Sequence, residues 1–125
     1  MSDCASCTRM VLGAVAGLLI GTSPAQSQTA GQKSAYEYAL RCWGVAGYLI
    51  TDPEVKANPE AAARVEAGAQ RVYNAALRMG AVLGYSQARI DEDLDLAGRV
   101  EGALMLRDRS YFERSKAACD QLGLS

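Results

Sequence analysis

Hydrophobic residues recur every seven positions between Pro59 and Leu83, and this period predicts one long helix with a narrow apolar seam. The seam positions are Val65, Val72 and Met79, with Gly68, Ala75 and Val82 three residues later and Ala69, Ala76 and Leu83 four residues later. Small side chains on such a seam let a neighbouring helix approach closely. Asn58 before Pro59 marks the start of this helix, and Gly84 stands where a C-terminal cap belongs.

The segment 36–49 is apolar on most sides and predicts a helix that lies inside the fold. We expect it to start at Ser34, which is a suitable N-cap. It contains Trp43, the single tryptophan of the chain. Gly44 and Gly47 lower helix propensity, so we expect either another backbone packed close against them or a helix that stops early.

Start and stop signals divide the rest of the chain into further helices. Residues 52–53, an Asp-Pro pair, predict the end of the first helix and one isolated turn. Apolar residues flank Ser86 at the spacing of a hydrophobic staple, which predicts a third helix from there. Residues 110–113 match a capping box and predict a fourth helix that ends near residues 122–123, with one continuous helix as the alternative. No strand pattern competes, so we expect an all-α bundle of three to four helices.

The N-terminal residues 1–27 have the parts of a secretory signal peptide: Arg9, the apolar run 10–20 and small residues after it. Such a run is shorter than the roughly 20 residues that span a bilayer. We therefore expect cleavage, with residues 28–33 as a flexible N-terminus and 34–125 as the helical domain. The prediction is a periplasmic or secreted protein without stable membrane insertion after cleavage. An uncleaved N-terminal segment that anchors the protein in the membrane is the alternative.

Two of the four cysteines, Cys42 and Cys119, remain after such cleavage. An even number of cysteines in an oxidising compartment favours a disulfide, which would tie the first helix to the last. Two free buried thiols are the alternative. Cys4 and Cys7 form a C-x-x-C spacing in the leader, where we expect no role for it, because a zinc site needs a second pair.

The net charge of the chain indicates no particular partner, and its composition indicates no cofactor. The 125 residues carry a formal net charge of −1, so no strong field gathers nucleic acid or anionic membrane. The chain has no histidine, and without it there is no Ser-His or Cys-His pair and no imidazole metal ligand. We expect a protein that is not an enzyme and binds no metal.

Three arginines, Arg64, Arg71 and Arg78, recur every seven residues beside the seam of the long helix. They form a candidate interaction ridge for an anionic group or another protein. The alternative is packing along the flank of the helix, with long arginine stems covering apolar neighbours and with Asp91 and Asp95 as partners on the next helix.

Four aromatic residues form a candidate pocket for an apolar or aromatic ligand between the helices: Tyr38, Trp43, Tyr73 and Tyr111. The alternative is that these side chains belong to the core, because each aromatic ring buries a large area in a small domain.

With its leader, its pair Cys42 and Cys119 and its helical pattern, the chain resembles the small exported two-cysteine helical proteins of Gram-negative bacteria. A characterised group of similar size and cysteine count is the periplasmic acid-stress chaperones. The resemblance is one of architecture, so it implies export and a helical fold and carries no functional residue onto this chain.

The leading functional hypothesis is a non-enzymatic protein that acts through protein contacts, as an adaptor, inhibitor or chaperone. It includes a homodimer formed through the seam of the helix 59–83. A carrier of a small apolar or aromatic ligand in the bundle interior is the alternative. A thiol redox enzyme is a third hypothesis, and it requires a reduced, reactive cysteine.

Overall fold

The computed structural model describes residues 30–124, and the chain divides at Lys33 into two units. The helical bundle belongs to the unit that starts at Lys33. The predicted signal peptide 1–27, with Cys4 and Cys7, lies outside the described residues. Helix already includes residues 30–33, part of the segment expected to be flexible, so Ser34 lies within a helix and the prediction that it is an N-cap was wrong.

The first described helix runs through residues 30–51 and is followed by a short helix, α2 (Pro53–Ala57). The Asp52 side chain accepts a hydrogen bond from the Glu54 backbone N–H at 2.9 Å, and Pro53 occupies the first helical position. An aspartate cap followed by proline starts a helix because the proline N–H would be unpaired there anyway. The predicted isolated turn is confirmed.

Helix α3 (Pro59–Val82) matches the predicted long helix within one residue at its end. Asn58 caps it through its side-chain oxygen, and Gly84 follows it with a left-handed φ of 81°. Five seam residues are buried inside the chain, at Val65, Gly68, Val72, Ala75 and Ala76, whereas Val82 at the end of the helix is 63% exposed. Most of the seam is therefore covered within one chain, and the homodimer that the heptad pattern suggested stays a prediction.

Helix α4 (Gln87–Arg107) begins at Ser86, whose hydroxyl accepts from the Arg89 backbone N–H. The chain then breaks at Asp108, which ends α4 and caps α5 (Arg109–Ala118) by accepting from the Tyr111 N–H at 3.1 Å. The predicted break is confirmed, and the alternative of one continuous helix was wrong. The cap was assigned to the wrong residue, because Ser110 lies inside α5.

A disulfide joins Cys42 of the first described helix to Cys119 at the end of α5, with their Cα atoms 5.6 Å apart. A single 3₁₀ turn, η1 (Asp120–Leu122), follows and ends at Gly123, whose φ is 78°. Arg71 of α3 donates hydrogen bonds to the carbonyls of Leu122 (3.1 Å) and Gly123 (3.2 Å). The predicted disulfide is confirmed, and Arg71 ties the end of the chain to α3.

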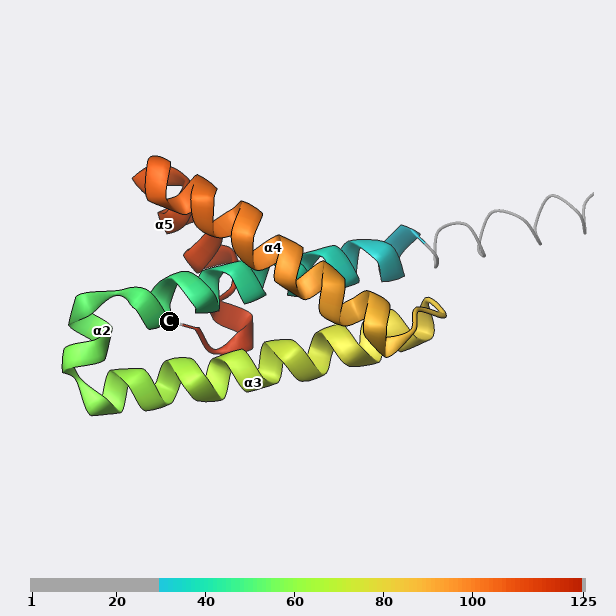
Figure 1. The fold of residues 1–125 in the computed structure, drawn as a ribbon, viewed down its shortest axis with the longest axis horizontal. Helices are drawn as coiled ribbons and strands as arrows, with labels where there is room; N and C mark the ends of the chain where they lie inside the picture. Colours follow the sequence, from blue (N-terminus) through green and yellow to red (C-terminus); the bar gives the residue numbers. More distant parts are fainter. Residues whose placement is uncertain (1–29, 125) are drawn as a thin grey trace, which may run out of the picture. The chain divides into compact units, whose positions relative to one another are not determined.

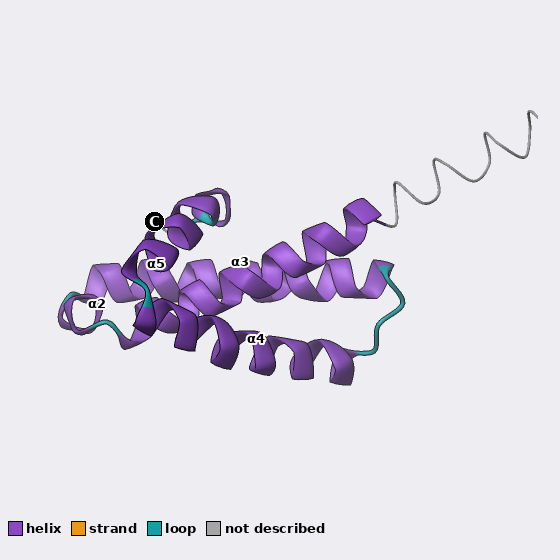
Figure 2. Ribbon diagram, turned by 90° about the horizontal axis from the view of Figure 1, so that it is seen from above, coloured by secondary structure: helices purple, strands orange, loops and turns teal. Residues whose placement is uncertain are grey.

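These helices form an all-α bundle, as predicted, and residues 30–124 contain no strand. Figure 1 shows α3 and α4 diverging from the turn that joins them, and α4 crossing the first described helix. Figure 2 shows the short loops that join the helices. The core has two clusters. One surrounds the disulfide and includes Val45, Val72, Met105 and Phe112, and the other lies nearer the α3–α4 turn and includes Tyr36, Ala76 and Ile90.

Candidate functional site: an apolar groove beside Trp43

An open groove lies between the first described helix and α4, on the side where Trp43 is half-buried. We call it the Trp43 groove, and its volume is about 350 Å³. Its lining comes from the two helices alone: Trp43, Gly47, Tyr48, Thr51, Leu94, Asp95, Gly98, Arg99, Gly102 and Leu106. Most of that surface is apolar or glycine, and Leu106 at its end keeps 76% of its surface exposed.

Glycines hold the floor of the groove open. A Cβ atom added at Gly47 or Gly102 would meet nothing within 4 Å, and one at Gly98 would meet only the Trp43 ring, at 3.8 Å. Each glycine lowers helix stability by roughly 1 kcal/mol relative to alanine. Since no packing among residues 30–124 requires Gly47 or Gly102, the space above them belongs to the surface of this part of the chain. The expected close contact is absent at Gly47.

The expected close contact does occur one turn earlier, at Gly44. A Cβ atom there would lie 2.5 Å from the Cβ of Glu101 and 3.4 Å from the Ala97 carbonyl oxygen. The first described helix therefore touches α4 at Gly44. This contact sets the distance between the two walls of the groove.

Polar groups stand at the rim of the groove and are already paired. Asp95 and Arg99 form an exposed i,i+4 ion pair of 2.9 Å on α4. The Thr51 hydroxyl donates to the Tyr48 carbonyl at 2.7 Å on the other wall. An apolar floor with a polar rim is the usual anatomy of a protein-binding surface.

Trp43 also faces α3, so the apolar surface continues on that side. Its ring lies 6.0 Å from that of Tyr73, with 48° between the planes. The two aromatic residues line a second open groove with Ile50, which is 43% exposed, and with Ala69. Trp43 therefore separates two shallow apolar depressions.

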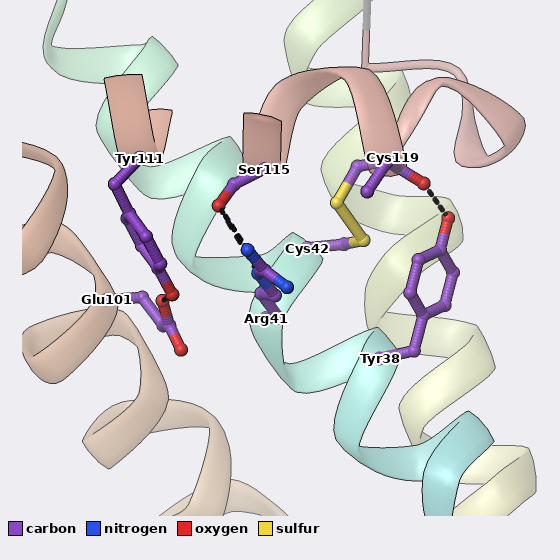
Figure 3. Close-up of a disulfide and its surroundings, with 8 residues drawn as sticks. Tyr38, Arg41, Cys42, Glu101, Tyr111, Ser115 and Cys119 are labelled. Atoms are coloured by element: carbon purple, nitrogen blue, oxygen red, sulfur yellow. Dashed lines mark hydrogen bonds between the residues drawn. A yellow bond between two sulfur atoms is a disulfide. The ribbon is translucent and has the colours of Figure 1, made fainter. Parts of the chain in front are cut away.

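The four aromatic residues of the predicted pocket do not share one cavity. Trp43 and Tyr73 are neighbours, as described above. The Tyr38 hydroxyl donates to the Ala118 carbonyl, and the Tyr111 hydroxyl donates to the Glu101 carboxylate. Figure 3 shows Tyr38 and Tyr111 on opposite sides of Cys42. Each of these two tyrosines thus joins α5 to another helix.

A polar network beside the disulfide is satisfied within the fold. Arg41 donates from Nε and Nη2 to the hydroxyl of the fully buried Ser115, at 3.2 and 2.9 Å, and its guanidinium lies over the Tyr111 ring. Burial, followed by the hydrogen bond to Glu101, raises the pKa of Tyr111. Both effects favour the neutral phenol, which is the hydrogen-bond donor. The network therefore connects helices, and it contains no nucleophile activated by a base.

The predicted arginine ridge is exposed along α3, but its members differ. Arg71 donates hydrogen bonds to the C-terminal carbonyls described above, whereas Arg64 and Arg78 are exposed to solvent. Asp91 and Asp95, the expected partners of these arginines, contact other residues. Asp95 forms an ion pair with Arg99, and Asp91 accepts a hydrogen bond from the Tyr73 hydroxyl at 3.4 Å.

Sequence reasoning missed the Trp43 groove, although it singled out Trp43. The signal available was the glycine spacing of α4, at Gly98 and Gly102, combined with an apolar residue four positions on at Leu106. No group of three or more potential metal-ligating side chains occurs within residues 30–124.

Comparison of the chain with protein-family models, curated proteins and solved structures gave no match. None of the helices in the described part of the chain combines the length and the hydropathy needed to cross a bilayer.

Proposed function

We propose that this protein is a non-enzymatic binding protein that holds an apolar helical segment of another protein in the Trp43 groove. One observation carries the proposal: the groove lining is mostly apolar, and its residue Leu106 keeps 76% of its surface exposed to water. Contiguous exposed apolar surface with a polar rim is typical of protein interaction sites.

The shape of the groove supports a protein segment over a small ligand. Sites for small molecules usually bury most of the ligand surface, whereas this groove is open to solvent along its length. The glycine floor lets a helix backbone approach closely, and an amphipathic helix laid in such a groove places every third or fourth side chain on the floor. These features favour protein contacts over the carrier hypothesis.

We also propose that the protein acts in the periplasm or after secretion. The Cys42–Cys119 disulfide supports this location, because such bonds persist in oxidising compartments and are rare in the cytosol. The predicted signal peptide supports it independently.

Site-specific crosslinking tests the groove. A photoreactive benzoylphenylalanine replaces Leu106 in one variant and Val82 in a control, since Val82 is another exposed apolar residue (63%) and lies at the end of α3. We expect mass spectrometry to identify a protein adduct from position 106 that position 82 does not give.

That protein, once purified, should bind the wild type in calorimetry. It should bind the variant Gly102→Leu, in which the new side chain fills the groove floor, at least tenfold more weakly. Identical adducts from both positions, or unchanged affinity for Gly102→Leu, would contradict the proposal.

A further inference from the structure

Helix α4 carries a second exposed apolar surface, on the flank away from the Trp43 groove. Leu96 and Val100 keep 54% and 50% of their surface exposed, and Ala103 is exposed as well. Positions separated by four and three residues share one face of a helix. We call this set of three residues the α4 stripe.

The apolar surface of the α4 stripe continues onto the first described helix. Leu96 and Val100 line an open groove of about 320 Å³ together with Tyr36, Leu40, Tyr85 and Ala97, and with five charged residues: Lys33, Glu37, Arg89, Asp93 and Glu101. The Tyr36 hydroxyl is occupied, because it donates to Asp93 at 2.7 Å. A helix placed along the stripe would therefore cover an apolar floor without leaving this hydroxyl unpaired.

Opposite charges stand at the two ends of the stripe. Glu92 lies four residues before Leu96, and Arg107 lies four residues after Ala103, so both share the face of the stripe. Both are exposed, and the ion pairs among residues 30–124 involve neither of them. Acidic residues outnumber basic ones in the first half of α4, at Asp91, Glu92, Asp93 and Asp95 against Arg89.

We infer that the α4 stripe binds the α4 stripe of a second copy of this chain, with the two helices antiparallel. This arrangement places Leu96 opposite Ala103 of the second copy and Glu92 opposite Arg107 of the second copy. Two-fold symmetry repeats each contact, so one apolar face is buried between two ion pairs. In a parallel pairing, Glu92 would face Glu92 of the second copy and Arg107 would face Arg107 of the second copy, so like charges would repel each other. Rim charges of this kind set orientation more than affinity.

Charge reversal provides the test. Glu92→Arg creates two repulsive contacts in the dimer, and so does Arg107→Glu, so each variant alone should dimerise on the order of tenfold more weakly. A mixture of the two variants restores both attractive contacts in a heterodimer. Sedimentation equilibrium should therefore show a two-chain mass for the wild type and for the equimolar mixture, at concentrations where each variant alone is a monomer.

Matched reversals on α3 serve as controls. Arg64→Glu and Glu66→Arg change exposed charges on a different helix and should leave the wild-type mass unchanged. A wild type that stays monomeric at millimolar concentration overturns the inference. So does a dimer that the α4 reversals leave intact, or a mixture that fails to reassociate. The α4 stripe is separate from the Trp43 groove. If the proposed partner binding in the Trp43 groove failed its test, the expected masses of the dimer and of its variants would stay the same.

Discussion

Two glycines on one turn of the first described helix have opposite surroundings. Gly44 faces the backbone and Cβ of α4, whereas Gly47 faces open space. Three residues correspond to about 300° of rotation around a helix, so the two positions differ by only about 60° in direction and are separated by about 4.5 Å along the helix axis. Both residues lower helix propensity equally, and of the two only Gly44 packs closely against another helix among residues 30–124.

Alanine substitution should separate these two roles. In Gly44→Ala the new Cβ would lie 2.5 Å from the Glu101 Cβ, an atom that cannot move without its helix. We expect overpacking to cost about 1–3 kcal/mol, partly offset by helix propensity. Gly47→Ala meets nothing and should raise the free energy of unfolding by up to about 1 kcal/mol. Urea unfolding of both variants measures the difference, and equal effects of the same sign would contradict this account.

Sequence alone could not tell these glycines apart. Their low helix propensity predicts a close approach at both, with a helix that stops early as the alternative. Which one faces α4 depends on the rotation of the first described helix about its axis, and this is decided by the packing of residues far away in the chain, such as Glu101. The open groove was missed for the same reason.

At the scale of elements, Asp108 is the residue that separates α4 from α5. It has extended backbone angles, with φ −137° and ψ 101°, and it serves as the last cap of one helix and the first cap of the next. Hydrophobic periodicity and capping signals predicted the break. They misplaced the cap by two residues because the serine at position 110 and the glutamate three residues later also match a capping box.

Removing each of the two competing caps tests the assignment. Asp108→Ala leaves the Tyr111 N–H without its acceptor and should lower the free energy of unfolding by about 1 kcal/mol. Ser110→Ala should change it by less than half of that, because Ser110 lies inside α5, where its hydroxyl accepts a hydrogen bond from Arg114. Chemical denaturation of both variants provides the measurement. A larger loss for Ser110→Ala would show that α5 starts at the predicted capping box.

At the scale of the whole molecule, the heptad period of α3 predicted an apolar seam but not what covers it. One hypothesis from the sequence was that a second copy of the chain covers this seam in a homodimer. In the structure the C-terminal residues pack on the same seam, where a Cβ at Gly68 would lie 2.6 Å from Leu124. The burial of Leu124 could not be predicted from hydrophobic periodicity, because a lone apolar residue after a glycine belongs to no repeat. Three of the five exposed large apolar residues within residues 30–124, Leu96, Val100 and Leu106, lie on α4.

The Cys42–Cys119 disulfide closes a loop across a sequence separation of 77 and joins the first described helix to the end of α5. In the chain-entropy model a loop of this length contributes about 4 kcal/mol, which is a large part of the stability of a small domain. The double variant Cys42→Ala/Cys119→Ala should lose about this much in urea unfolding. Iodoacetamide should label neither cysteine in the native wild type unless a reductant is added, since both are fully buried and bonded. Labelling without reductant would show free thiols, and it would remove the main structural support for a location outside the cytoplasm.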